Sequence, residues 1–76
     1  MSEASKIWYE LHMNVGSETR TIQTATDINE LHARINSIRE HGFVYSNGHV
    51  YELENVSLHI DKWRNPNNPE LIESIQ

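Results

Sequence analysis

Histidine is the residue type in this sequence with the widest chemical use, as a metal ligand and as a general acid or base. The chain has five histidines, and their spacing matches neither a helical pair four residues apart nor an HExxH motif. His12 and His59 could meet across neighbouring strands, with Glu10 or Asp61 beside them, as ligands of a metal ion. Solvated histidines on a polar face are the better interpretation, so we expect no metal site and no cofactor.

Nucleophilic and acid–base motifs are also missing from the sequence. No serine lies in a G-x-S-x-G elbow, and Ser57 with His59 is what any strand with two polar positions on one face would give. Each glycine is isolated, so no glycine-rich phosphate loop is present. Carboxylate pairs among Glu10, Glu52, Glu54 and Asp61 are conceivable, but a domain this small rarely offers a cleft that desolvates one of them. We therefore expect no catalytic residues and no enzyme activity.

Composition and charge narrow the choice of partner. Eleven acidic and six basic side chains among 76 residues give a formal net charge of −5, which opposes binding to phosphate backbones and anionic membranes. The basic residues are dispersed, and direct nucleic-acid binding is not expected. The absence of cysteine excludes disulfides and thiolate sites. Because no long apolar run or secretory signal is visible, we expect a cytoplasmic protein without membrane contact.

The elements that position these side chains follow from hydrophobic spacing. From Lys6 to Val15 apolar and polar residues alternate, which predicts a half-buried strand with Trp8 and His12 on its outward side. Thr19 to Gln23 is rich in β-branched residues and predicts a short edge strand that pairs back on the first.

An amphipathic helix follows. Its apolar residues recur at steps of three and four, and they are Ile28, Leu31, Ile35 and Ile38. Thr26 or Asp27 can cap its start, and Gly42 is placed to end it in the left-handed conformation.

The stretch from Phe43 to Ile60, FVYSNGHVYELENVSLHI, predicts a β-hairpin. Asn47-Gly48 between two apolar-rich runs is typical of a type I′ turn, in which both central residues need positive φ. The alternation slips by one residue at Glu54-Asn55, which predicts a bulge or a sharp bend. Beyond that bend, Val56–Ile60 could leave the hairpin and pair elsewhere, including across a dimer.

The two prolines in residues 65–69 predict a linker, because proline removes a backbone donor and restricts its neighbour. Pro69 at a first helical position, with Asn68 as cap, predicts one or two helical turns in 70–76. The expected fold is therefore α+β, with a ββαββ order: a four-stranded, mainly antiparallel sheet, one helix packed on one face and a short C-terminal helical turn. Residues 1–64 would form the domain, and 65–76 the linker and the helical segment.

Aromatic residues are numerous for so small a core, and tryptophan and tyrosine are enriched at the centres of protein interfaces. Trp8 lies in the outward phase of its strand, so its burial would need a partner or the C-terminal segment. A short chain without disulfides often gains burial by oligomerising, and we expect a homodimer. The residues predicted to bind a partner are Trp8, His12, Tyr45, Tyr51, Glu52 and Trp63.

Over its full length the chain resembles, in size, acidic charge and architecture, the small accessory proteins that bacteriophages and mobile elements encode to bind and inhibit or redirect host proteins. No motif carries the resemblance, so no family residues are transferred to this sequence. The resemblance implies a protein-binding module that occludes a surface of a host protein. Two alternatives stay open: a small-molecule or nucleotide sequestering protein that uses Arg20, Lys62 or Arg64 with an aromatic ring, and an acidic mimic of nucleic acid.

Overall fold

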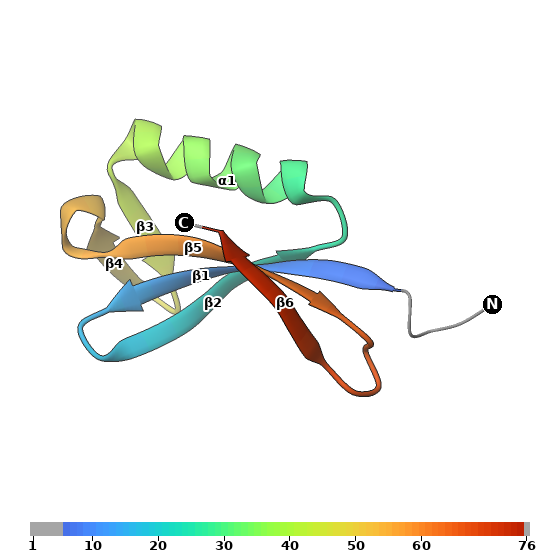
Figure 1. The fold of residues 1–76 in the computed structure, drawn as a ribbon. Helices are drawn as coiled ribbons and strands as arrows, with labels where there is room; N and C mark the ends of the chain where they lie inside the picture. Colours follow the sequence, from blue (N-terminus) through green and yellow to red (C-terminus); the bar gives the residue numbers. More distant parts are fainter. Residues whose placement is uncertain (1–5, 76) are drawn as a thin grey trace.

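The computed structural model describes residues 6–75. Within them one helix and six strands follow one another along the chain (Figure 1). Their bounds are β1 (Ile7–Val15), β2 (Glu18–Ala25), α1 (Ile28–His41), β3 (Phe43–Ser46), β4 (His49–Glu52), β5 (Ser57–Arg64) and β6 (Glu70–Ile75). In this described part of the chain, no helix is both long and apolar enough to cross a membrane.

Four of the strands form one antiparallel sheet, in the order β2-β1-β5-β6, and β3 with β4 forms a separate two-stranded sheet. Figure 1 shows α1 lying across one side of the larger sheet, with the β3–β4 hairpin beyond the end of the helix. The α+β class and the four-stranded antiparallel sheet are confirmed. The predicted ββαββ order is too short, because the described residues hold six strands.

The core lies between α1 and the larger sheet, and it has two adjoining clusters. Leu11, Leu31 and Ile60 form the first; Met13, Ile38 and Val44 form the second. The second cluster therefore joins the sheet, the helix and the β3–β4 hairpin. This shared packing holds the hairpin against the rest of the domain although no strand of the larger sheet pairs with it.

Both ends of α1 are closed as the sequence indicates. The Asp27 carboxylate accepts a hydrogen bond from the Asn29 N–H at 2.9 Å, and so Asp27 rather than Thr26 is the N-terminal cap. Gly42 has φ +82°, and its N–H donates to the Ile38 carbonyl at 2.8 Å. The left-handed glycine turns the chain directly from the helix into β3.

The β3–β4 hairpin has the predicted tight turn, with φ +54° at Asn47 and +81° at Gly48. The predicted break in alternation is a short 3-10 helix over Leu53–Asn55. After this turn the chain enters β5, which leaves the hairpin and pairs with β1 instead. The interpretation that Val56–Ile60 pairs elsewhere is thus confirmed, and its partner is β1 of the same chain.

The prediction of a C-terminal helical turn is wrong. Residues 70–75 form β6, which pairs antiparallel with β5 along the edge of the sheet. Pro66 lies within a turn that reverses the chain onto β5, and Pro69 follows it. The Asn68 N–H closes this turn by donating to the Asn65 carbonyl at 2.9 Å. A run this short fits helical and extended spacing equally well, and the unpaired edge of β5 offers backbone partners that decide for the strand. Gln76, the last residue of the predicted helix, lies outside the described residues.

Candidate functional site

Two surfaces carry the residues that the sequence singles out, and the first is the side of the larger sheet opposite α1, here called the open face. Cross-strand neighbours on β1 and β5 form its centre. They are Trp8 opposite Trp63, Glu10 opposite Asp61, and His12 opposite His59. The register of β1 and β5 therefore brings together the two tryptophans that were predicted to bind a partner. It also brings together the two histidines of the possible metal site.

Glu10 accepts hydrogen bonds from the side chains before and after it on the same face of β1. The Trp8 Nε1–H donates to Glu10 Oε2 at 3.1 Å, and the His12 Nε2–H donates to Glu10 Oε1 at 3.1 Å. The Thr21 hydroxyl oxygen lies 3.1 Å from Nδ1 of the same ring, within hydrogen-bond distance. His12 is thus fixed between β1 and β2.

Asp61 is the second carboxylate of the open face. It is only 9% exposed, and polar side chains from three strands surround it. The Ser74 hydroxyl donates to its Oδ1 at 2.6 Å, which ties β6 to β5. The Nε2 atoms of His12 and His59 lie 3.4 Å from the two oxygens of the same carboxylate. A buried carboxylate is costly unless polar groups meet it, and here the Ser74 hydroxyl bonds Asp61 while the two imidazole rings lie beside it.

The polar side chains of the open face contact one another across the strands. His12 and His59 do meet across the strands, with ring centroids 5.2 Å apart. However, no group of three or more His, Asp or Glu side chains within residues 6–75 has the geometry to hold a metal ion. The Asn14 amide donates to His59 Nδ1 at 2.9 Å, and among the described serines no hydroxyl bonds a histidine ring. The hydroxyl that does reach a histidine ring is that of Thr21, whose oxygen lies 3.1 Å from His12 Nδ1.

Trp8 and Trp63 stack on each other at one end of the open face, with ring centroids 6.2 Å apart and 12° between the ring planes. Both side chains are half-buried within the single chain. Burial of the outward-facing Trp8 therefore comes from β5, and a second copy is not needed to cover the ring.

The second surface is the outward side of the β3–β4 hairpin, here called the hairpin face. It is formed by Phe43 and Tyr45 on β3 and by Val50 and Glu52 on β4, which lie opposite each other in pairs. Phe43 is 40% exposed, Tyr45 60% and Val50 61%. On the inward side of the same hairpin, Val44 is buried in the core. The hairpin therefore has one anchored side and one exposed apolar side.

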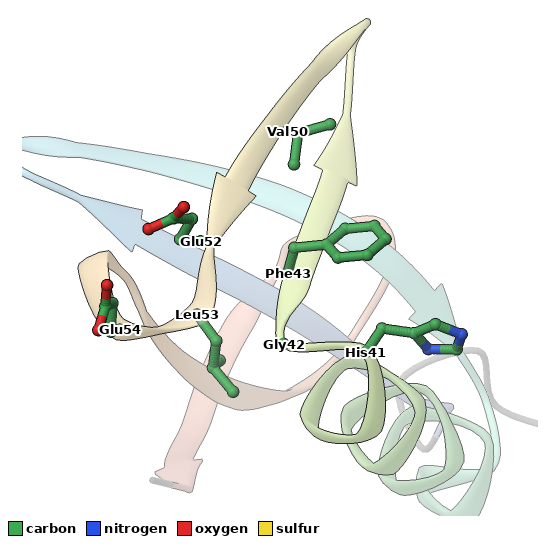
Figure 2. Close-up of a pocket in the computed structure, with 7 residues that line it drawn as sticks. All are labelled: His41, Gly42, Phe43, Val50, Glu52, Leu53 and Glu54. Atoms are coloured by element: carbon green, nitrogen blue, oxygen red, sulfur yellow. The ribbon is translucent and has the colours of Figure 1, made fainter.

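A hollow of about 670 Å³ opens beside the hairpin face, where α1 turns into β3 (Figure 2). Figure 2 shows Phe43 and His41 on one side of it, and Glu52 and Glu54 on the other, with Leu53 at its lower end. The ring centroids of His41 and Phe43 lie 5.8 Å apart in an edge-on arrangement. The hollow is thus lined by the Phe43 ring on one side and by the carboxylates of Glu52 and Glu54 on the other.

A second hollow, of about 290 Å³, lies between the hairpin and the helix. Phe43 and Tyr45 line it from β3, and Arg34, Ser37 and His41 line it from α1. Phe43 therefore stands between two hollows, one with carboxylates at its margin and one with a guanidinium group.

The structure divides the six predicted partner-binding residues between the two surfaces. Trp8, His12 and Trp63 belong to the open face, whereas Tyr45 and Glu52 belong to the hairpin face. Glu52 does not share a face with Trp8 and His12, because β4 is not a strand of the larger sheet. Tyr51 is half-buried and packs against the core cluster on the inward side of the hairpin.

Phe43 and Val50 are exposed apolar residues of the hairpin face that sequence reasoning did not single out. The Asn47-Gly48 turn contained the missing signal, since its register places Phe43, Tyr45, Val50 and Glu52 on one side of the hairpin. Comparison with protein-family models, curated proteins and solved structures gives no match to this chain.

Proposed function

We propose that this protein is a protein-binding module that covers a surface of a partner through its hairpin face. The observation that carries the proposal is the gathering of Phe43, Tyr45 and Val50, all at least 40% exposed, on one side of one short hairpin. Scattered apolar side chains are normal on a protein surface, whereas a contiguous group beside hollows is typical of an interaction site.

The support beneath the hairpin face favours binding of a folded partner. Val44 is buried in the core, Gly42 fixes the angle between helix and hairpin, and the tight turn sets the strand register. A surface held in this way loses little conformational entropy when it binds. Phe43 and Tyr45 add large contact areas with few rotatable bonds, which is the character of residues at interface centres.

Charges at the two margins of the hairpin face favour one orientation of the partner. Glu52 and Glu54 lie on one side of Phe43, and Arg34 and His41 lie on the other. Such a pattern gives specificity and speeds association more than it adds affinity. We infer an accessory or inhibitory role of the kind that the resemblance implies, exerted by occluding the surface that the hairpin face covers.

The nucleotide-sequestering alternative has less support. Its candidate cations include Arg20 and Arg64, and each already pairs with a carboxylate. Arg20 Nη2 lies 3.1 Å from Glu18 Oε1, and Arg64 Nη2 lies 2.9 Å from Glu70 Oε2. At either arginine a phosphate group would have to displace the paired glutamate, which leaves Lys62 as the remaining candidate cation. The exposed apolar group on the hairpin face is what favours protein binding.

The test is capture of a partner from lysates of candidate host bacteria with three tagged chains. The wild type is compared with Tyr45→Ser/Val50→Ser, which removes most of the hairpin face, and with Ile7→Ser, which removes an exposed apolar side chain elsewhere. We expect the wild type and the control to retain the same partner by mass spectrometry and the hairpin variant to lose it. Calorimetry with the purified partner should show a loss of affinity of at least about tenfold. Retention of the partner by a folded hairpin variant would refute the proposal.

A further inference from the structure

The outer edge of β4 has backbone groups that no strand in residues 6–75 uses. The Leu53 N–H donates to the Gly42 carbonyl at 3.0 Å, so this pair is hydrogen-bonded across the hairpin. Bonded and non-bonded pairs alternate along an antiparallel ladder. Glu52 and Val50 lie one and three residues from Leu53 toward the turn, in the non-bonded pairs. They therefore direct their N–H and C=O groups away from β3, toward the outer edge.

The same two residues present their side chains on the hairpin face. Val50 is 61% exposed, and Glu52 lies at the margin of the larger hollow. An extended segment that pairs with this edge would therefore place every second side chain over the hollow, beside Phe43. Backbone pairing would supply affinity, and the hollow would select the side chain.

Charge decides which side chain fits. Glu52 and Glu54 are exposed, and neither has an ion-pair partner among the residues that the structure describes. In Figure 2 both carboxylates stand on the β4 side of the hollow, across from Phe43. A lysine or arginine can lay its aliphatic stem against Val50 and Phe43 while its charged end meets the two glutamates.

A second copy of this chain does not satisfy that chemistry. Pairing of β4 with β4 of another copy would bring a second Glu52 and a second Glu54 to the same seam. The stretch from His49 to Asn55 contains no lysine or arginine to balance them.

We infer that β4 receives an extended, basic segment of the partner protein as an added strand, with a lysine or arginine side chain lying across Val50 and Phe43 toward Glu52 and Glu54. The inference rests on the proposed function and specifies its partner as a strand with alternating apolar and basic side chains.

The experiment uses the full chain and an N-acetylated, C-amidated peptide that alternates valine and lysine. Amide hydrogen exchange is followed by NMR at Val50, Glu52 and Tyr51. Strand addition should slow exchange at Val50 and Glu52, whose N–H groups point outward. Tyr51 is the internal control, since its N–H already faces β3 and its protection should change little.

Two further peptides and two variants separate strand addition from simple attraction. A valine–glutamate peptide should fail to protect β4. The valine–lysine peptide N-methylated at its lysines should fail as well, because residues opposite Val50 and Glu52 in an antiparallel pair direct their own N–H groups toward β4. Glu52→Gln/Glu54→Gln should weaken binding of the valine–lysine peptide by roughly three- to tenfold. Glu30→Gln/Glu73→Gln, which removes two exposed carboxylates elsewhere, should leave it unchanged.

Strand addition is overturned if Val50 and Glu52 gain no protection. It is also overturned if the N-methylated peptide binds as tightly as the unmethylated valine–lysine peptide. Equal binding by Glu52→Gln/Glu54→Gln overturns the basic character of the segment, and protection of β4 that grows with protein concentration alone identifies a second copy instead. If Tyr45→Ser/Val50→Ser still abolishes capture of the natural partner in these cases, the proposed function stands and the inference about the segment is wrong.

Discussion

The indole rings of Trp8 and Trp63 lie almost parallel across β1 and β5, with 12° between their planes and 6.2 Å between their centroids. The two strands also share the register that positions Glu10 opposite Asp61 and His12 opposite His59. The indole pair therefore lies on the central seam of the sheet, next to its polar network.

We predict that the two tryptophans stabilise this seam as a pair. In a double-mutant cycle, Trp8→Ala and Trp63→Ala should show a coupling free energy of about 1 kcal/mol, because stacked aromatic pairs contribute beyond their buried area. Urea denaturation of the wild type, both single variants and the double variant measures it. Strictly additive losses in the free energy of unfolding would mean that the stack has no energetic role.

A homodimer remains the prediction for a chain of this size, and the exposed side chains of β6 are where the larger sheet can gain burial. Leu71 is 47% exposed and Ile72 39%, on an edge strand. We expect sedimentation equilibrium to give twice the chain mass for the wild type, and Leu71→Ser to shift it toward the monomer. Trp8→Ala should leave the dimer intact, because Trp63 already covers that ring. A wild type that remains a monomer at all concentrations would contradict the dimer.

The β5–β6 hairpin should loosen in acid. The hydrogen bonds from the Arg64 guanidinium, and then its charge, hold the pKa of the Glu70 carboxyl below its ordinary value. A carboxyl group with a lower pKa in the folded chain stabilises the fold above its unfolded-state pKa, and that contribution is lost as the pH falls through the lowered folded value. Amide exchange along β6 should therefore rise below the ordinary carboxyl range.

The matched control for this pH effect is the pair of variants Glu70→Gln and Glu73→Gln. Glu70→Gln should remove the acid-dependent step in β6 exchange, because it leaves Arg64 without a titrating partner. Glu73→Gln should preserve the step. An unchanged pH profile in Glu70→Gln would show that another group loosens the hairpin.

Gly42 should be sensitive to substitution for a backbone reason alone. Its φ of +82° strains any residue with a Cβ, although no atom lies within 4 Å of where that Cβ would be. Gly42→Ala should lower the free energy of unfolding by about 1 kcal/mol, and Gly42→Asn by less, because asparagine tolerates the left-handed region better. Thermal and urea unfolding compare them. Equal stability of Gly42→Ala and the wild type would contradict the strain argument.

The parts of the fold that the sequence predicts correctly depend on short-range chemistry. Asp27 and Gly42 close the helix because a cap needs only neighbouring backbone groups. Asn47-Gly48 forms the hairpin turn because both residues tolerate positive φ. The break at Glu54-Asn55 was visible as a change of phase in the alternation, and it is present as a 3-10 helix.

The parts that sequence reasoning missed depend on partners far along the chain. Residues 70–75 form a strand because β5 offers a free edge, which the spacing of Leu71, Ile72 and Ile75 cannot reveal. The candidate site was predicted in part, since Tyr45 and Glu52 lie on the hairpin face. Phe43 and Val50 were missed, because alternation gives two sides of a hairpin but not which side the core will cover.

The strand order β2-β1-β5-β6 also has a consequence for the time course of folding. The β1–β2 and β5–β6 hairpins and α1 each form from residues close together in the chain, whereas the β1–β5 seam joins residues as distant as Ile7 and Arg64. Closing so long a loop costs chain entropy before any contact compensates for it. We therefore expect two hairpins to form early and the seam to set the folding rate, with Trp8 fluorescence reporting the slow step.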